Sequence, residues 1–212
     1  TEILSEVEEY TIEEYLPAVE RGGFIAEDKK QAVAEKLARY TGLKKELILD
    51  HNLTVSRNAF RKELLRDEGF FLGSSDARYK GIDKMDAGDK YTGSTHPESA
   101  AWGNAFTPAI NTYLRNDLNF KTDLQYHVSG SVSPWPWDRF TDGTGKRLRN
   151  AMMQNPHLEV LFQAGYYDML VNYFRQKNGM WKLDPSGKMK DRLHFKVYES
   201  GHMMYVREKD CV

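Results

Sequence analysis

Two short apolar stretches, each ending in a glycine and one ionisable residue, constrain this chain more than any other feature. Residues 158–168 read Leu-Glu-Val-Leu-Phe-Gln-Ala-Gly-Tyr-Tyr-Asp, and residues 193–202 read Leu-His-Phe-Lys-Val-Tyr-Glu-Ser-Gly-His. Runs of this length and residue type predict β-strands. Asp168 and His202 lie 34 positions apart (168 to 202), which leaves room for one helix and a loop between two adjacent strands.

The turn after each predicted strand carries the candidate chemistry. A strand followed by Asp and a later strand followed by His is how an α/β-hydrolase presents the last two members of a Ser-Asp-His triad. In such a triad the His carries the proton of the Ser hydroxyl, and the Asp holds the imidazole in the correct tautomer. The pattern therefore predicts Asp168 as the orienting residue and His202 as the general acid and base, within hydrogen-bond distance of each other. Gly165 and Gly201 are expected to give both turns the backbone freedom of a sharp bend.

The same two blocks carry a family resemblance. Gln-Ala-Gly-Tyr-Tyr-Asp-Met at 163–169 and Tyr-Glu-Ser-Gly-His-Met-Met-Tyr at 198–205 resemble the bacterial branch of the serine carboxypeptidase (carboxypeptidase Y-like) family. Segments 39–43, 60–67 and 113–118 look like parts of that family in the same order. The resemblance implies an α/β fold, namely the C-terminal part of an α/β-hydrolase with a helical lid-type insertion. It also implies that Met203 occupies a substrate-pocket position, as an alternative to apolar core filling.

The sequence contains no motif for the nucleophile of such a triad. Neither Gly-x-Ser-x-Gly nor the family's Gly-Glu-Ser-Tyr-Gly occurs, and the nearest segment, Gly-Ser-Ser-Asp-Ala at 73–77, is expected to be a loop. The resemblance implies that an N-terminal segment of the same protein supplies the Ser, so we expect the 212-residue chain alone to be inactive. The continuous apolar run at 160–162 predicts a strand covered on both faces of a parallel sheet, which requires neighbouring elements.

Three segments are expected along the chain. Residues 1–70 predict a lid-like helical insertion, with a helix starting at the capping box Thr11–Glu14, another over 27–40, a shorter one over 43–49 and one capped by Ser56. A brief extended link is expected at 52–55. Residues 71–97, rich in Gly, Asp, Lys and Ser, predict a linker loop. Residues 98–212 predict the hydrolase core, with helices at 98–118, 145–155 and 168–177 and a short strand at 124–128.

Composition narrows the range of ligands. The formal net charge is −1, with 30 basic and 31 acidic residues, which does not favour nucleic acid or an anionic membrane as a partner. No apolar run approaches the roughly 20 residues of a membrane-spanning helix. Cys211 is the only cysteine, so an intrachain disulfide is excluded. The histidines show no metal-binding spacing, and neither a metal nor another cofactor is expected.

Three functions are compatible with these patterns. The first is a serine carboxypeptidase-like peptidase acting on a peptide substrate through an acyl-enzyme. The second is another α/β-hydrolase, an esterase or aminopeptidase, which would prefer esters or peptides with a blocked C-terminus. The third is a non-catalytic fragment or binding module, because a triad without its Ser retains only weak catalysis.

Overall fold

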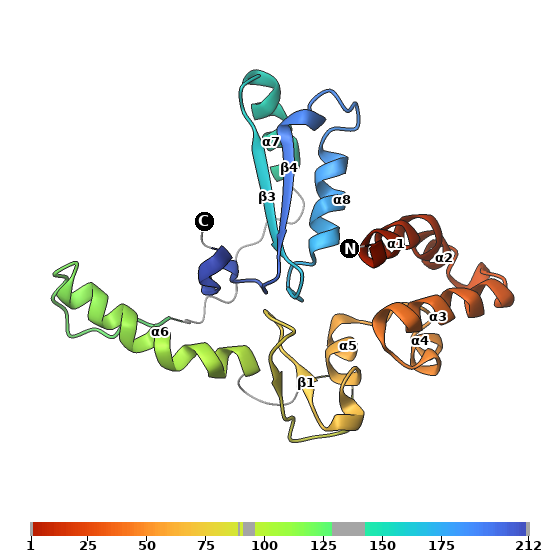
Figure 1. The fold of residues 1–212 in the computed structure, drawn as a ribbon, viewed down its shortest axis with the longest axis horizontal. Helices are drawn as coiled ribbons and strands as arrows, with labels where there is room; N and C mark the ends of the chain where they lie inside the picture. The colour runs from red at the N-terminus through yellow and green to blue at the C-terminus, as the bar shows by residue number, and fades with distance from the viewer. Residues whose placement is uncertain (1, 89, 91–95, 129–142, 211–212) are drawn as a thin grey trace. The chain divides into compact units, whose positions relative to one another are not determined.

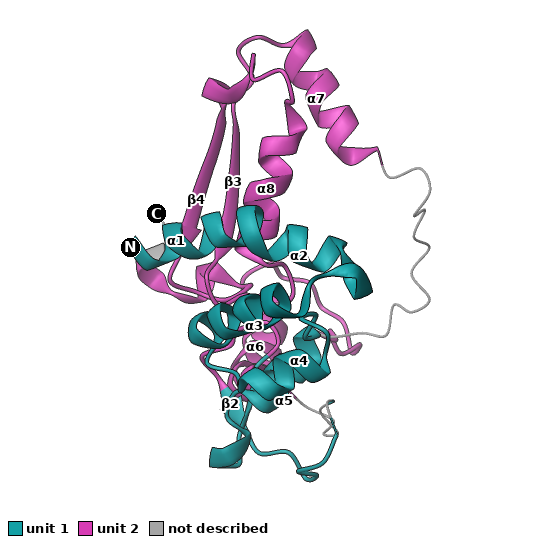
Figure 2. Cartoon of the chain, turned by 90° about the vertical axis from the view of Figure 1, so that its right-hand side faces the viewer, with its two compact units in different colours: residues 1–73, 80–94 teal, residues 74–79, 95–212 magenta. Residues whose placement is uncertain are grey.

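The computed structural model describes residues 2–88, 90, 96–128 and 143–210. The chain divides into two compact units, coloured separately in Figure 2: residues 1–73 with 80–94, and residues 74–79 with 95–212. Helices and strands are both present, so the chain has a mixed α/β structure. Segment 74–79 of the expected linker is part of the second unit, and residues 89 and 91–95 of that linker lie outside the described residues.

The first unit begins with one continuous helical stretch, so the helix start predicted at Thr11 is wrong. The stretch comprises α1 (Glu2–Tyr10), a π-helical turn (Thr11–Tyr15) and α2 (Leu16–Glu20). The hydroxyl of Thr11 donates to the carbonyl of Val7 at 2.7 Å, which is the bond a hydroxyl makes inside a helix rather than at its start. The π turn lies just before Pro17, which lacks an N–H and whose ring disturbs the preceding turn of a regular helix.

Three further α-helices follow in this unit: α3 (Glu27–Thr41), α4 (Lys45–Asp50) and α5 (Arg57–Glu63). Two short 3-10 helices, Gly22–Phe24 and Arg66–Glu68, precede α3 and follow α5. The predicted helix over 27–40 is confirmed, and it ends at Gly42, whose φ of +75° is a conformation that glycine adopts without strain. The predicted cap is also confirmed, since the Ser56 side chain accepts from the Ala59 N–H at 3.1 Å. The extended link expected at 52–55 is wrong, because Asn52 and Leu53 have φ values of 48° and 66°.

The core of the first unit lies among these helices. Its buried members are Tyr10, Ala18, Val33, Ala34, Leu43, Ile48 and Leu53. Burial of Leu53, which is 2 % exposed, offsets the strain of its left-handed backbone. The Tyr10 hydroxyl donates to the Val33 carbonyl at 2.9 Å, so this buried polar group is satisfied.

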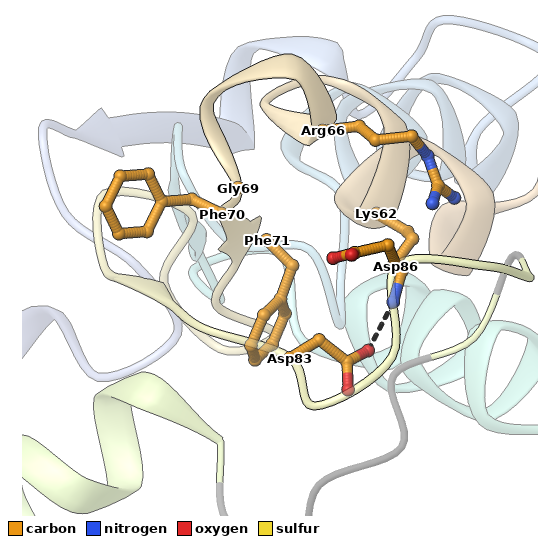
Figure 3. Close-up of a pocket in the computed structure, with 7 residues that line it drawn as sticks. All are labelled: Lys62, Arg66, Gly69, Phe70, Phe71, Asp83 and Asp86. Atoms are coloured by element: carbon orange, nitrogen blue, oxygen red, sulfur yellow. Dashed lines mark hydrogen bonds and ion pairs between the residues drawn. The ribbon is translucent and has the colours of Figure 1, made fainter.

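A short hairpin and a buried ion pair close the first unit. β1 (Phe71–Leu72) pairs antiparallel with β2 (Lys80–Gly81), so residues 71 and 72, assigned to a loop by sequence, form a strand. The ammonium group of Lys62 on α5 bonds both the Asp83 carboxylate and the Met85 carbonyl, as Figure 3 shows for the carboxylate. Both charged side chains are almost completely buried. The pair therefore attaches the loop after β2 to α5.

The second unit contains a parallel strand pair with its helices. In chain order its elements are α6 (Pro97–Asn116), α7 (Thr144–Gln154), β3 (Val160–Gly165), α8 (Tyr173–Leu183) and β4 (Leu193–Tyr198). β3 and β4 run parallel and side by side (Figure 1), with Val160 opposite Leu193 and Gly165 opposite Tyr198. The two strands predicted from the apolar runs are therefore confirmed, and their carboxyl ends meet.

One face of this strand pair is packed and the other is open. Met152, Leu183 and Met189 are buried against Val160, Phe162 and Leu193, which share one face of the pair. On the opposite face, Leu161 is 51 % exposed. Within the described residues β3 is thus covered on one face only, and the two-sided coverage expected from its apolar run is absent.

Two other expectations for this unit are wrong. The helix predicted over 168–177 begins only at Tyr173, because the Asn172 side chain accepts from the Phe174 and Arg175 N–H groups and caps it there. No strand forms at 124–128. The backbone N–H and C=O of Tyr126 bond instead to the Asn111 side chain on α6, at 3.3 and 3.4 Å.

Candidate active site

The turns that follow β3 and β4 lie against each other through their backbones. The Tyr166 N–H donates to the Tyr198 carbonyl at 3.0 Å, and the Tyr167 N–H donates to the Ser200 carbonyl at 3.1 Å. These bonds extend the strand pairing beyond Gly165 into the turns. The two segments that carry Asp168 and His202 are therefore fixed by main-chain contacts.

Gly165 is needed for this contact, and Gly201 is needed for the contact of its turn with residues 75–76, because neither position has room for a side chain. A Cβ on Gly165 would lie 2.2 Å from the Ser200 carbonyl oxygen, and a Cβ on Gly201 would lie 2.4 Å from the Ser75 carbonyl oxygen. Neither glycine has a positive φ. The expected reason, backbone freedom, is thus replaced by close approach of neighbouring backbone.

The predicted hydrogen bond between the two candidate residues is present. His202 Nδ1 lies 2.9 Å from Asp168 Oδ2. The other carboxylate oxygen, Oδ1, accepts from the N–H groups of Leu170 and Val171 at 2.8 and 3.0 Å. The Asp168 side chain is 4 % exposed whereas that of His202 is 46 % exposed. The buried carboxylate is thus held by backbone N–H groups at Oδ1, and its Oδ2 orients the partly exposed imidazole of His202. We call these two residues the Asp168–His202 pair.

The remaining nitrogen of His202, Nε2, is the one available for proton transfer in this geometry. A neutral imidazole that donates Nδ1–H to a carboxylate has its lone pair on Nε2. Among the described residues Nε2 has no hydrogen-bond partner. The backbone N–H of His202 donates to the Ser75 carbonyl at 2.6 Å, which fixes the base of the side chain. The arrangement can therefore accept and return a proton at Nε2.

Ser74 and Ser75, the second of which accepts from the His202 backbone N–H, are held by a buried glutamate. Glu98 Oε1, in the first turn of α6, accepts from the Ser74 and Ser75 N–H groups, both at 2.7 Å, and from the Ser75 hydroxyl at 3.0 Å. The hydroxyl of Ser75 thus bonds Glu98 and not His202. Glu98 is 1 % exposed, and its Oε2 is buried with no hydrogen-bond partner in the described part of the chain.

Sequence reasoning missed Glu98. Its only sequence signal is a carboxylate after the proline that starts a helix, where acidic residues are common and usually solvated. In the structure Glu98 instead accepts from the backbone N–H of Ser75, whose carbonyl accepts from the backbone N–H of His202.

A cavity of about 400 Å³ has Met203, the residue that follows His202, in its wall. We call it the Trp102 cavity. Its lining residues are Asp76, Arg78, Tyr79, Trp102, Met203, Val206 and Arg207. The Asp76 carboxylate accepts from Arg78 Nε and Nη2 at 3.0 and 2.6 Å. This ion pair raises the pKa of the Arg78 guanidinium, so the group stays cationic.

Two absences concern the described residues. No group of three or more His, Cys, Asp or Glu side chains in them is arranged to hold a metal ion. None of their helices has both the length and the hydropathy required to span a bilayer.

Comparison of the chain with family models, with curated proteins and with solved structures finds no match. The geometry of the Asp168–His202 pair and of the cavity beside it is therefore the basis for any functional conclusion.

Proposed function

We propose that this chain carries the acid–base part of a serine carboxypeptidase-like hydrolase site, with Asp168 as the orienting residue and His202 as the proton carrier. The observation that supports this most is the 2.9 Å hydrogen bond from His202 Nδ1 to a buried carboxylate whose other oxygen is held by two backbone N–H groups. This is the relation that the His and Asp of a hydrolytic triad require.

The proposed reaction needs a Ser hydroxyl beside His202 Nε2, which an N-terminal segment of the same protein supplies. His202 takes the proton of that hydroxyl while its oxygen attacks the carbonyl carbon of the peptide bond. The imidazolium then gives the proton to the leaving amine, and an acyl-enzyme remains. A water molecule, activated in the same way, releases the acid and restores the Ser. Asp168 stays ionised throughout and stabilises the imidazolium.

Two features of the second unit support placing this part within an α/β-hydrolase fold. β3, α8 and β4 form a strand–helix–strand unit with parallel strands, and Asp168 and His202 follow the carboxyl ends of those strands. In addition, the open face of β3, with Leu161 half exposed, provides an apolar surface for further elements of such a fold.

The test uses the polypeptide that carries this chain, recovered with an antibody from the cells that produce it. We expect the recovered material to react with a fluorophosphonate, which labels activated serines, and to release free amino acids from peptides with a free C-terminus. Asp168→Asn should lower kcat by about 10⁴-fold, because it favours the wrong His tautomer. The purified 212-residue chain should show neither reaction.

Other outcomes would contradict the proposal in different ways. Recovered material that does not react with the fluorophosphonate would refute a serine hydrolase. Equal turnover of esters and of C-terminally amidated peptides would replace the carboxypeptidase with an esterase or another peptidase. Turnover by the 212-residue chain alone would refute the external nucleophile.

A further inference from the structure

The Trp102 cavity has an aromatic wall whose polar groups are already paired. The Trp102 indole N–H donates to the Tyr79 hydroxyl at 3.0 Å, and the two rings meet edge to face with centroids 5.3 Å apart. The indole therefore needs no further hydrogen bond from a ligand. A ring held in place in this way offers contact area to a ligand at little cost in conformational entropy.

The other walls of the cavity also favour an aromatic ligand. Met203, the residue next to His202, contributes a thioether, and sulfur makes favourable contacts with aromatic rings. Arg78 contributes a guanidinium that already lies 5.1 Å from the centre of the Tyr167 ring, the geometry of a cation–π contact. An aliphatic side chain would gain from neither of these interactions beyond its apolar area.

The charge of the cavity disfavours a basic ligand. Both oxygens of Asp76 are bonded to Arg78, and the Asp76 side chain is only 3 % exposed. Arg207 also lines the cavity, and its Nη2 lies 3.6 Å from the Glu199 carboxylate. The one carboxylate among the lining residues is thus already paired and is not left to bind a ligand cation.

We propose that the Trp102 cavity binds an aromatic side chain of the substrate, next to the bond on which His202 acts. The position of Met203, directly after His202 and in the wall of the cavity, connects the two sites. The identification of the ligand as a peptide residue rests on the proposed function. The cavity then selects aromatic over aliphatic residues and rejects basic ones.

The test is a binding titration of the full chain in which proton NMR monitors the indole N–H signals of its four tryptophans. The probes are the N-acetyl amides of phenylalanine, leucine, arginine and aspartate, which differ only in their side chains. We expect the phenylalanine amide to shift the Trp102 signal and to bind about three- to tenfold more tightly than the leucine amide. The arginine amide should not bind.

Variants assign the effect to the cavity. Trp102→Leu should weaken binding of the phenylalanine amide about three- to tenfold, whereas Trp181→Leu, on α8 and outside the cavity, should leave it unchanged. If Trp102→Leu does not fold, Met203→Leu, which conserves volume and removes the sulfur, should weaken binding about two- to fivefold.

Two results would overturn this inference: equal affinity for the phenylalanine and leucine amides, or tighter binding of the arginine or aspartate amide. Because the titration needs no turnover, its result is independent of the test for a serine hydrolase. The chain could bind the aromatic amide while the recovered polypeptide fails to react with the fluorophosphonate. That result would support the aromatic site and refute the serine hydrolase.

Discussion

Asp168 combines two tasks that sequence reasoning treats as one. Its Oδ2 orients His202, while its Oδ1 holds the N–H groups of Leu170 and Val171 and so shapes the turn in which it lies. The side chain of an Asp is short enough to bond its own backbone two residues on. A Glu would place the carboxylate one methylene further away and lose this local bond, so the residue type itself is part of the geometry.

Alanine at Gly201 or Gly165 should disrupt the Asp168–His202 pair, because the added Cβ would overlap neighbouring backbone atoms. We expect the free energy of unfolding of each variant to fall by about 1–3 kcal/mol. We also expect each variant to lose the downfield NMR signal of the His202 Nδ1 proton. Urea denaturation and proton NMR measure the two effects.

Gly179 provides the matched control for these substitutions. It lies inside α8, and a Cβ there would meet nothing within 4 Å. Gly179→Ala should therefore stabilise the chain by about 0.4–1 kcal/mol and leave the proton signal in place. A Gly201→Ala variant that behaves like this control would show that the Asp168–His202 pair does not depend on the close approach of Gly201 to residues 75–76.

At the scale of elements, the sequence could predict what depends on local pattern. The helix at 27–41 and the strands β3 and β4 followed from apolar spacing and from the glycine that ends the helix. The start of α8 was wrong because Asp168 uses its side chain in a turn, and Asn172 then caps the helix. Both residue types are common helix starts, and here the Asn172 side chain forms the cap.

Other elements depended on partners that the sequence does not show. Thr11 and Glu14 match a capping box, yet the helix begins at Glu2, so the hydroxyl of Thr11 turns to the Val7 carbonyl instead. Glu98 has the same local pattern as a solvated helix-start carboxylate, and only the fold brings Ser74 and Ser75 to it. The Asp168–His202 pair was predictable because its two residues each follow a recognisable strand.

The connection between α8 and β4 should make stability depend on pH. Asp184 accepts from the Ser186 hydroxyl and from the Met189 N–H, both at 2.6 Å, and these bonds lower the pKa of its carboxyl below 3.8. A carboxyl whose pKa is lower in the folded state adds stability above its ordinary pKa and loses it as the pH falls through the folded value.

Asp184→Asn should therefore be less stable than the parent chain near neutral pH. The difference in unfolding free energy should shrink as the pH is lowered through and below 3.8. Urea denaturation of both chains over this range tests the expectation. A difference that stays constant with pH would mean that the ionised carboxylate contributes nothing that an amide cannot replace.

At the scale of the whole molecule, two separate apolar cores stand out. The core around Ile48 lies in the first unit, and the core around Met152 lies in the second; both side chains are fully buried. Each core draws its buried members from one unit. The residues of the Asp168–His202 pair and of the Trp102 cavity belong to the second unit.

Cavity-forming substitutions should reveal this division. Ile48→Ala and Met152→Ala should each cost about 2–5 kcal/mol. We expect each to raise amide hydrogen exchange in its own unit, because local opening follows the core that is damaged. Mass spectrometry of peptides from residues 27–63 and 144–198 reports the two units separately. An equal loss of protection from hydrogen exchange in both sets of peptides would show that the chain opens as one cooperative unit.

The close contact of the turns at Gly165 and Gly201 has a consequence for how freely the surrounding sequence can change. Main-chain hydrogen bonds join the two segments that carry Asp168 and His202, and the atoms nearest to the Cβ of an alanine at Gly165 would be main-chain atoms. Replacements around the pair therefore alter the chemistry of the wall without altering the distance between the two partners. We therefore expect substitutions in the wall of the Trp102 cavity to change which ligands it accepts while the Asp168–His202 distance stays the same.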